Sequence, residues 1–330
     1  MPKLQSDSMD NKRKRFVIAA IAVAVLLALI MGVTVVSTRM TRSSEGRVVK
    51  IEDAAAPPSP SKAAAPTFQL SNTPKIKVGV YLSHFTANGP NWTGKGWGYN
   101  SQVRIIRELK SPEIELYALI EPGSEKEPDL VAKLNTHFKT RPKLDVTNVT
   151  ALRQLDVIVA NCVNNVPDPA LTALETVVGE GKGLFIRCVM GDFEPGFTAQ
   201  VSRLHGLSDG AYAWNKEPVE ALVVGEHPIL GTLSGKKETM MRVRANGGFG
   251  AFVPNAVPLI RLRDGQVVHP STEAPEEWPF YPLYVSSLGK GRIVVCSMAG
   301  FAETPDELQA ATGGRFVPRA IAWAAGRDVK

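Results

Sequence analysis

The chain contains little cysteine, with only three among its 330 residues. Three cysteines are too few for a disulfide framework, and their wide spacing excludes a structural zinc site, which needs four ligands in short paired spacings. Cys162, Cys188 and Cys296 each lie at or near the end of an apolar, strand-like run, where a free cysteine usually serves as a small buried side chain. If the domain is exported, a disulfide between Cys162 and Cys188 is the alternative, because both end strands that would be neighbours in a sheet.

The bulk of the chain also lacks an excess of positive charge, although the whole chain carries a net charge of +6. Residues 1–15 and 38–50 each carry a net charge of +3, so the charges of residues 51–330 cancel. No basic stripe interleaved with aromatic residues occurs in that remainder, and nucleic acid is therefore not expected as a partner.

One long hydrophobic run is present, from Phe16 to Val36, and it is uncharged and directly follows four basic residues. At a rise of about 1.5 Å per residue it reaches roughly 30 Å, which is the thickness of the hydrocarbon core of a bilayer. A cleavable signal peptide is the alternative, but its apolar region is usually shorter and ends at a small-residue cleavage site. We expect a single-pass transmembrane helix over residues 16–37, which acts as a signal-anchor with membrane lipid as its partner.

The basic residues on both sides of this run decide the expected topology. The cluster before Phe16 is denser than the one after the run, so residues 1–15 are expected to form a cytoplasmic tail and the globular domain to be extracytoplasmic. Residues 38–74 are rich in Ala, Pro and Ser. Such a segment cannot bury enough apolar surface to fold, so it is expected to be a flexible tether.

Residues 75–328 have the composition of one ordinary globular domain. Continuous apolar runs alternate with helical patterns from Ile76 to Met190, and this alternation predicts βαβ units with a mostly parallel sheet covered by helices on both faces. After Gly191 several strand-like segments follow with short turns, at 219–225, 239–245, 258–263, 282–287 and 291–298. We therefore expect a flavodoxin-like, three-layer αβα core in the α/β class, with a C-terminal β-rich extension and a last helix from Phe316.

The order of several motifs resembles a known family. These motifs are LDVIVANC, GKGLFIRCV, GEHPILGTL, YPLYVSSLGKGRIVVCSMAGF and RAIAWAAG, and together they resemble the ThuA-like (trehalose-utilisation) branch of the class I glutamine amidotransferase-like superfamily. The resemblance covers most of residues 76–326. It implies a flavodoxin-like core and suggests the binding of a sugar-related ligand, for which fold alone is a weak warrant.

The resemblance also directs attention to the strand ends. ThuA-like proteins tend to carry histidines in segments similar to LHS and GHE, but this chain has Arg187-Cys188-Val189 and Ala299-Gly300-Phe301 there. Both histidines are replaced, so metal binding is not expected. His227, in the segment EHPI, matches the family's HPI turn and is a candidate ligand-binding residue, although a histidine before proline more often satisfies backbone groups.

Cys188 is the candidate nucleophile, because its place in GKGLFIRCV corresponds to the nucleophile elbow of amidotransferases. Its neighbours lack the small residues that a strained elbow needs, and no base is evident to form the thiolate. Asp192 and Glu194 follow it in the next loop, and His84 ends the first strand. These three side chains are expected to lie at the same edge of the sheet, the one formed by the carboxyl ends of its strands. They are the alternative acid–base group.

The loop between the first strand and the first helix is the candidate ligand-binding segment. It lies at the carboxyl edge of the expected sheet, where open α/β sheets bind ligands, and it precedes a helix amino terminus that favours an anion. Its aromatic residues are able to stack on a sugar, and its glycines allow close backbone approach. The residues in question are Trp92, Gly94, Gly96, Trp97, Gly98, Tyr99 and Asn100.

Three functions remain open from the sequence. The first is a membrane-anchored domain that binds a small polar ligand, such as a carbohydrate, or a protein partner, without amidotransferase chemistry. The second is a hydrolase or sugar-modifying enzyme that uses Cys188 or the acid–base group. The third is a scaffold in an envelope complex. No motif indicates a cofactor.

Overall fold

A computed structural model describes residues 74–82, 97–123, 136, 143–164, 166–191, 198–214, 217–263, 269–270, 280–298 and 304–329, all of which belong to one compact unit. The expected cytoplasmic tail, the transmembrane helix 16–37 and the tether up to residue 73 lie outside the described residues. Within the described ranges, no helix combines the length and hydropathy needed to cross a bilayer.

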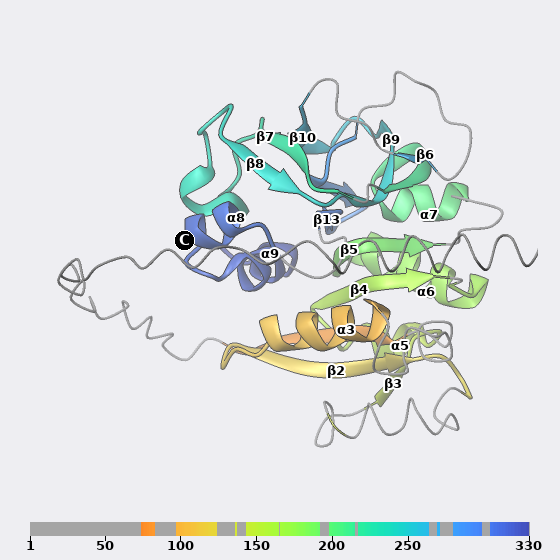
Figure 1. Cartoon of the computed structure of the whole chain (residues 1–330). Coiled ribbons are helices and arrows are strands. Elements are labelled where there is room, and N and C mark those ends of the chain that lie inside the picture. The colour runs from red at the N-terminus through yellow and green to blue at the C-terminus, as the bar shows by residue number, and fades with distance from the viewer. Residues whose placement is uncertain are drawn as a thin grey trace, which may run out of the picture. The chain divides into compact units, whose positions relative to one another are not determined.

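The core of the described unit is a ten-stranded sheet (Figure 1). Its strands lie in the order β3 (Lys143–Asp145), β2 (Ile114–Ile120), β1 (Ile76–Leu82), β4 (Val157–Asn164), β5 (Gly183–Gly191), β13 (Gly291–Cys296), β12 (Leu283–Leu288), β10 (Val257–Leu262), β7 (Val219–Val223) and β8 (Met240–Val243). The strands β3, β2, β1, β4, β5 and β13 pair in parallel with their neighbours. The other four strands, β12, β10, β7 and β8, extend the sheet beyond β13 with antiparallel pairs.

Helices cover both faces of the sheet (Figure 1). One face packs against α3 (Trp97–Glu108), the 3₁₀ turn η3 (Pro228–Leu233), α8 (Asp306–Ala311) and α9 (Phe316–Ala324). The other face packs against α5 (Val149–Leu152), α6 (Asp168–Glu180) and α7 (Ala199–Leu204). Strand β1 is buried at every position except Lys77, as a strand covered on both faces should be.

Helix α6 illustrates how local sequence sets these boundaries. Pro169 lies in its first turn, where no intrahelical N–H is needed, and Asp168 places a negative charge at the amino terminus. Its buried residues recur at helical spacing and face the sheet: Ala170, Leu171, Ala173, Leu174, Val177 and Val178. The helix ends at Gly181, whose φ of 124° is a conformation that glycine adopts without strain.

The parallel part of the sheet has one topological switch point. From β1 the chain builds β2 and β3 on one side, and then crosses back to build β4, β5 and β13 on the other side. Ligands of open α/β sheets bind outside the carboxyl ends of the strands at such a point. Here the switch point lies between the carboxyl ends of β1 and β4, and α3 begins at the same edge.

A second, three-stranded sheet was not predicted from the sequence. It consists of β11 (His269–Pro270), β6 (Leu207–Trp214) and β9 (Asn246–Phe252), paired in that order and antiparallel. Its β9 contacts the end of β5. A Cβ atom built on Gly247 of β9 would lie 2.2 Å from the carbonyl oxygen of Cys188, so the small sheet lies directly on the carboxyl end of β5.

The fold class expected from the sequence is confirmed for the domain. The α/β architecture, the large sheet with a parallel core and the C-terminal β-rich extension are all present, and the strands expected at 219–225, 239–245, 258–263, 282–287 and 291–298 correspond to β7, β8, β10, β12 and β13. The helix expected from Phe316 is α9.

Candidate functional site

The carboxyl ends of β4 and β5 carry a β-bulge. Asn161 pairs with Arg187, whereas Val163 pairs with Met190, so two residues of β5 oppose one residue of β4. Cys162 and Cys188 occupy the bulge with φ angles of 52° and 70°. A non-glycine residue in this left-handed region costs of order 1–3 kcal/mol, and such residues gather at functional sites.

All three cysteines are free thiols, and all three are buried. The structure therefore does not contain the disulfide between Cys162 and Cys188 that was the alternative from the sequence. Burial raises the pKa of Cys296 to about 11 and outweighs the opposite effect of the neighbouring Arg187. This thiol is accordingly neutral at physiological pH and not a nucleophile.

Cys188 lies at the place expected for a nucleophile elbow, but its side chain has no exposed surface. The small sheet explains this burial, since a Cβ atom at Gly247 would lie 2.1 Å from Ser297 Oγ as well as 2.2 Å from the Cys188 carbonyl oxygen. Only a glycine allows β9 to approach β5 and β13 so closely. The backbone of Cys188 therefore lies against β9, and its thiol is buried.

Arg187, next to Cys188, is the largest side chain in the protein core and is 2% exposed. Its guanidinium forms an ion pair with Glu108 at the last turn of α3, with Nη1 donating to Oε2 at 2.5 Å and Nη2 to Oε1 at 3.5 Å. The Glu108 side chain is 19% exposed. The positive charge of Arg187 is thus neutralised within the domain.

Gln102 of α3 lies at the switch point. Its side chain is 1% exposed, and its Nε2 donates to the carbonyl oxygen of Asn161 at 2.6 Å. Its Oε1 atom is buried and has no hydrogen-bond partner in the described residues. A buried acceptor without a donor costs about 1–3 kcal/mol, so this atom marks a place where a bound molecule with a donor group would be stabilised.

A second buried polar contact lies on the other side of the switch point. The Tyr81 hydroxyl donates to Glu121 Oε1 at 2.6 Å, and both side chains are buried. Burial, together with the nearby Glu121 carboxylate, raises the pKa of Tyr81 well above its usual range. Tyr81 is therefore a neutral donor that holds Glu121 at the carboxyl end of β2.

The structure describes only some of the residues predicted to form the site. His84, Asp192, Glu194, Trp92, Gly94 and Gly96 lie outside the described residues, so their roles stay predictions. Trp97, Gly98, Tyr99 and Asn100 form the first turn of α3. The structure thus places this predicted ligand-binding turn at the carboxyl edge, close in sequence to Gln102.

His227 lies at the opposite edge of the sheet and is not part of this group. Its Nδ1 accepts from the backbone N–H of Ile229 at 3.3 Å and caps η3, and its ring packs edge-on against Trp323, with centroids 4.8 Å apart. Trp323 also contacts Arg292, at the amino end of β13. Burial lowers the pKa of His227 to about 4, which keeps the ring neutral, as its capping role requires.

Sequence reasoning missed three polar residues of the carboxyl edge. Gln102 and Glu108 fall within a helical pattern, and Tyr81 falls within an apolar, strand-like run. Gln102 had a signal, because it stands in α3 beside buried positions such as Ile105 and Ile106. Among the described residues, no group of three or more His, Cys, Asp and Glu side chains is placed to hold a metal ion.

Comparisons with known proteins give a fold-level similarity. No family model matches the chain, and no curated protein matches it. Among solved structures, a ThuA-like protein from Bacteroides uniformis is 12% identical, with a TM-score of 0.43, over 77% of this chain and 94% of that one. The chain is similar to a ThuA-like protein.

Two β-galactosidases are also similar in structure. The enzyme from Rahnella sp. R3 is 13% identical, with a TM-score of 0.43, and a catalytic mutant of a GH42 β-galactosidase from G. stearothermophilus is 11% identical, with a TM-score of 0.40. They cover 77% and 78% of this chain. The matched part is about a third of either enzyme, 32% and 31% of its length.

Proposed function

We propose that the domain binds a small polar ligand of the carbohydrate class at the carboxyl edge of its sheet, without covalent chemistry at cysteine. The observation that carries the proposal is the buried Oε1 of Gln102 at the switch point between β1 and β4, which has no hydrogen-bond partner among the described residues. A hydroxyl group of the ligand would donate to this oxygen. The aromatic residues predicted at the start of α3 would supply the stacking surface that sugars prefer.

The described residues do not favour the enzymatic alternative. Cys188 is buried and lies against Gly247. The charge of Arg187, which would favour a neighbouring thiolate, is paired with Glu108. A reactive cysteine needs both access and an adjacent base or positive charge. The acid–base group of His84, Asp192 and Glu194 stays a sequence prediction.

The binding proposal predicts a selective effect of Gln102→Met. This change removes the acceptor while keeping the length of the side chain, so we expect the affinity for a carbohydrate to fall about tenfold, the loss of one hydrogen bond. The measurement is saturation-transfer NMR with galactose, glucose and trehalose on the full chain in lipid nanodiscs. Cys188→Ala should leave the affinity unchanged.

The matched control is Gln154→Met, which alters an exposed glutamine away from the carboxyl edge. If wild-type protein binds none of the three sugars, or if both glutamine variants bind as wild type does, the proposal is wrong. Trp97→Ala provides an independent variant for the same site, because it removes a predicted stacking surface without touching the hydrogen bond between Gln102 and Asn161.

We further propose that residues 16–37 anchor the domain in a membrane, with the domain outside the cytoplasm. The uncharged apolar run and the basic cluster before it support this proposal. The full chain should stay in the membrane pellet after alkaline carbonate extraction, and protease added to intact cells or spheroplasts should digest the domain. Recovery of a soluble form shortened by some forty residues, or full protection from protease, would contradict the anchor or its orientation.

A further inference from the structure

A hollow lies at the opposite edge of the sheet from the proposed ligand site. It has a volume of about 400 Å³ and is lined by Arg203 of α7, by residues 253–255 between β9 and β10, and by residues 287–289 at the end of β12. Ser287 pairs with Arg292 near the start of β13, whereas Leu283 pairs with Cys296 at its carboxyl end. The hollow therefore lies near the amino end of β13, about four strand residues or roughly 13 Å from the carboxyl end of that strand.

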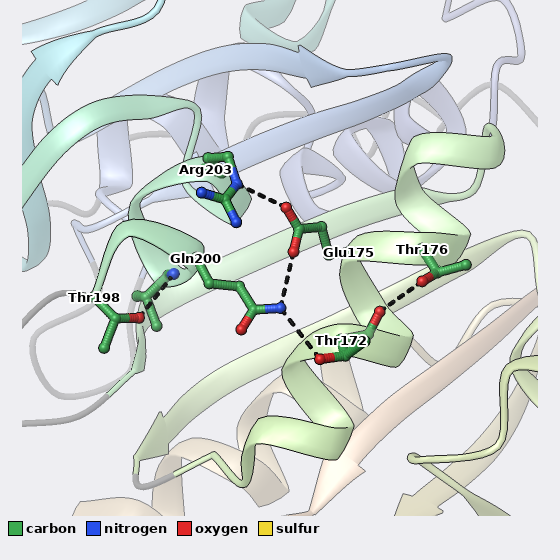
Figure 2. Close-up of polar contacts among 7 residues, drawn as sticks. Thr172, Glu175, Thr176, Thr198, Gln200 and Arg203 are labelled. Carbon is green, nitrogen blue, oxygen red and sulfur yellow. Dashed lines mark hydrogen bonds and ion pairs between the residues drawn. The ribbon is translucent and has the colours of Figure 1, made fainter.

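Arg203 is held in this hollow by a hydrogen-bond network that links α6 and α7 (Figure 2). Its Nε donates to Glu175 Oε1 at 2.7 Å, and Gln200 Nε2 donates to the other oxygen of the same carboxylate at 2.8 Å. Figure 2 shows that only the Nε nitrogen of Arg203 meets Glu175. Its terminal nitrogens Nη1 and Nη2 form no hydrogen bond within the described residues.

Glu175 is ionised in this network. The hydrogen bond from Arg203 is the main cause that lowers the pKa of Glu175 below its ordinary value. A carboxylate on Nε fixes the plane of the guanidinium, so that its two terminal amino groups are presented together as a fork. Such a fork matches the two oxygens of a carboxylate.

The rest of the lining is mostly apolar and is held in place by Asn255. The Asn255 amide donates to Ser287 Oγ at 2.5 Å and to the Ser287 carbonyl oxygen at 3.2 Å, which ties the 253–255 loop to β12. With its amide engaged in this way, Asn255 shapes the wall and adds little charge. Val253, Pro254 and Leu288 supply the apolar surface.

We propose that this hollow binds a small organic acid with a compact apolar body, whose carboxylate pairs with the terminal nitrogens of Arg203. The apolar body would lie against Val253, Pro254 and Leu288. A neutral molecule of the same shape would lack the charged partner for the guanidinium fork, so recognition depends on the negative charge. The site is independent of the carbohydrate site proposed at the carboxyl edge.

Isovalerate and its neutral amide, isovaleramide, are the probes that test the proposal, with the full chain in lipid nanodiscs and saturation-transfer NMR as the readout. Isovalerate should bind and isovaleramide should not. Arg203→Gln should weaken isovalerate roughly tenfold, because it removes the charged fork. Glu175→Gln keeps an amide oxygen that accepts from Arg203 Nε but removes the negative charge nearest to the ligand, so it should strengthen isovalerate binding about two- to fivefold.

Arg153→Gln is the matched control, since Arg153 forms the same kind of exposed pair with Glu180 at the end of α6. It should leave isovalerate binding unchanged. Equal binding of acid and amide, equal effects of Arg203→Gln and Arg153→Gln, or no binding of isovalerate to wild type would each overturn the proposal. The opposite shift expected for Glu175→Gln keeps the test decisive if Arg203→Gln fails to fold.

Discussion

Replacing Glu108 by glutamine is expected to lower the free energy of unfolding of the domain by about 3–5 kcal/mol. The reason is that Glu108 is the ion-pair partner of the buried Arg187. Arg187 is 2% exposed, so the change removes the carboxylate with which this buried guanidinium forms its ion pair. A guanidinium does not lose its proton at any accessible pH, and the cost therefore falls on the stability of the fold.

Urea unfolding of the full chain in detergent micelles, followed by tryptophan fluorescence, measures this change. Glu180→Gln, which breaks the exposed pair with Arg153, is the control and should change stability little, because solvent screens such pairs. The double variant Glu108→Gln with Arg187→Met should be more stable than Glu108→Gln alone, since it also removes the buried positive charge. An unfolding curve for Glu108→Gln that coincides with wild type would show that this pair does not stabilise the core.

Gly247→Ala is expected to separate the small sheet from the carboxyl end of β5. The new methyl group would lie 2.1 Å from Ser297 Oγ and 2.2 Å from the Cys188 carbonyl oxygen, and neither neighbour is the flexible end of a long side chain. Overpacking of this kind typically costs 1–3 kcal/mol, so we expect a loss of about 3 kcal/mol. We also expect Cys188 to become accessible as β9 moves away.

Thiol labelling with a maleimide, followed by peptide mapping, measures this accessibility. Cys188 should be labelled faster in Gly247→Ala than in wild type, while Cys296, buried within the main sheet, should stay unlabelled. The control is Gly179→Ala in α6, where a Cβ atom would meet nothing within 4 Å and alanine favours the helix. Equal labelling and equal stability of Gly247→Ala and wild type would be incompatible with β9 lying on the bulge.

The parallel core was predictable because its signals are local. Runs such as 76–82 and 157–163 are mostly apolar, and the helical pattern of 168–180 is followed by a glycine. The small sheet was not predictable, because β6 and β9 contain Asp209, Gly210, Gly247 and Gly250, which weaken any strand signal. Their pairing joins Leu207 to Phe252, and such a distant partner decides the conformation of both segments.

The candidate site was only partly predictable for a similar reason. The sequence indicated the correct edge, since the carboxyl ends of the parallel strands and the start of α3 meet there. It did not indicate that Glu108 pairs with Arg187, a partner 79 residues away, or that the segment carrying Gly247 covers Cys188. His227 was assigned to the site by a short motif, but the packing of Trp323 against its ring holds it at the other edge.

The two ends of the ten-stranded sheet have a consequence for how the protein behaves at high local concentration. The sheet terminates on one side in β3, with three residues, and on the other in β8, with four. These are its shortest described strands, and Arg242 points outward from β8. Short edge strands that carry charged residues offer few unpaired backbone N–H and C=O groups to a neighbouring copy. The domain is therefore protected from aggregation by edge-to-edge strand pairing.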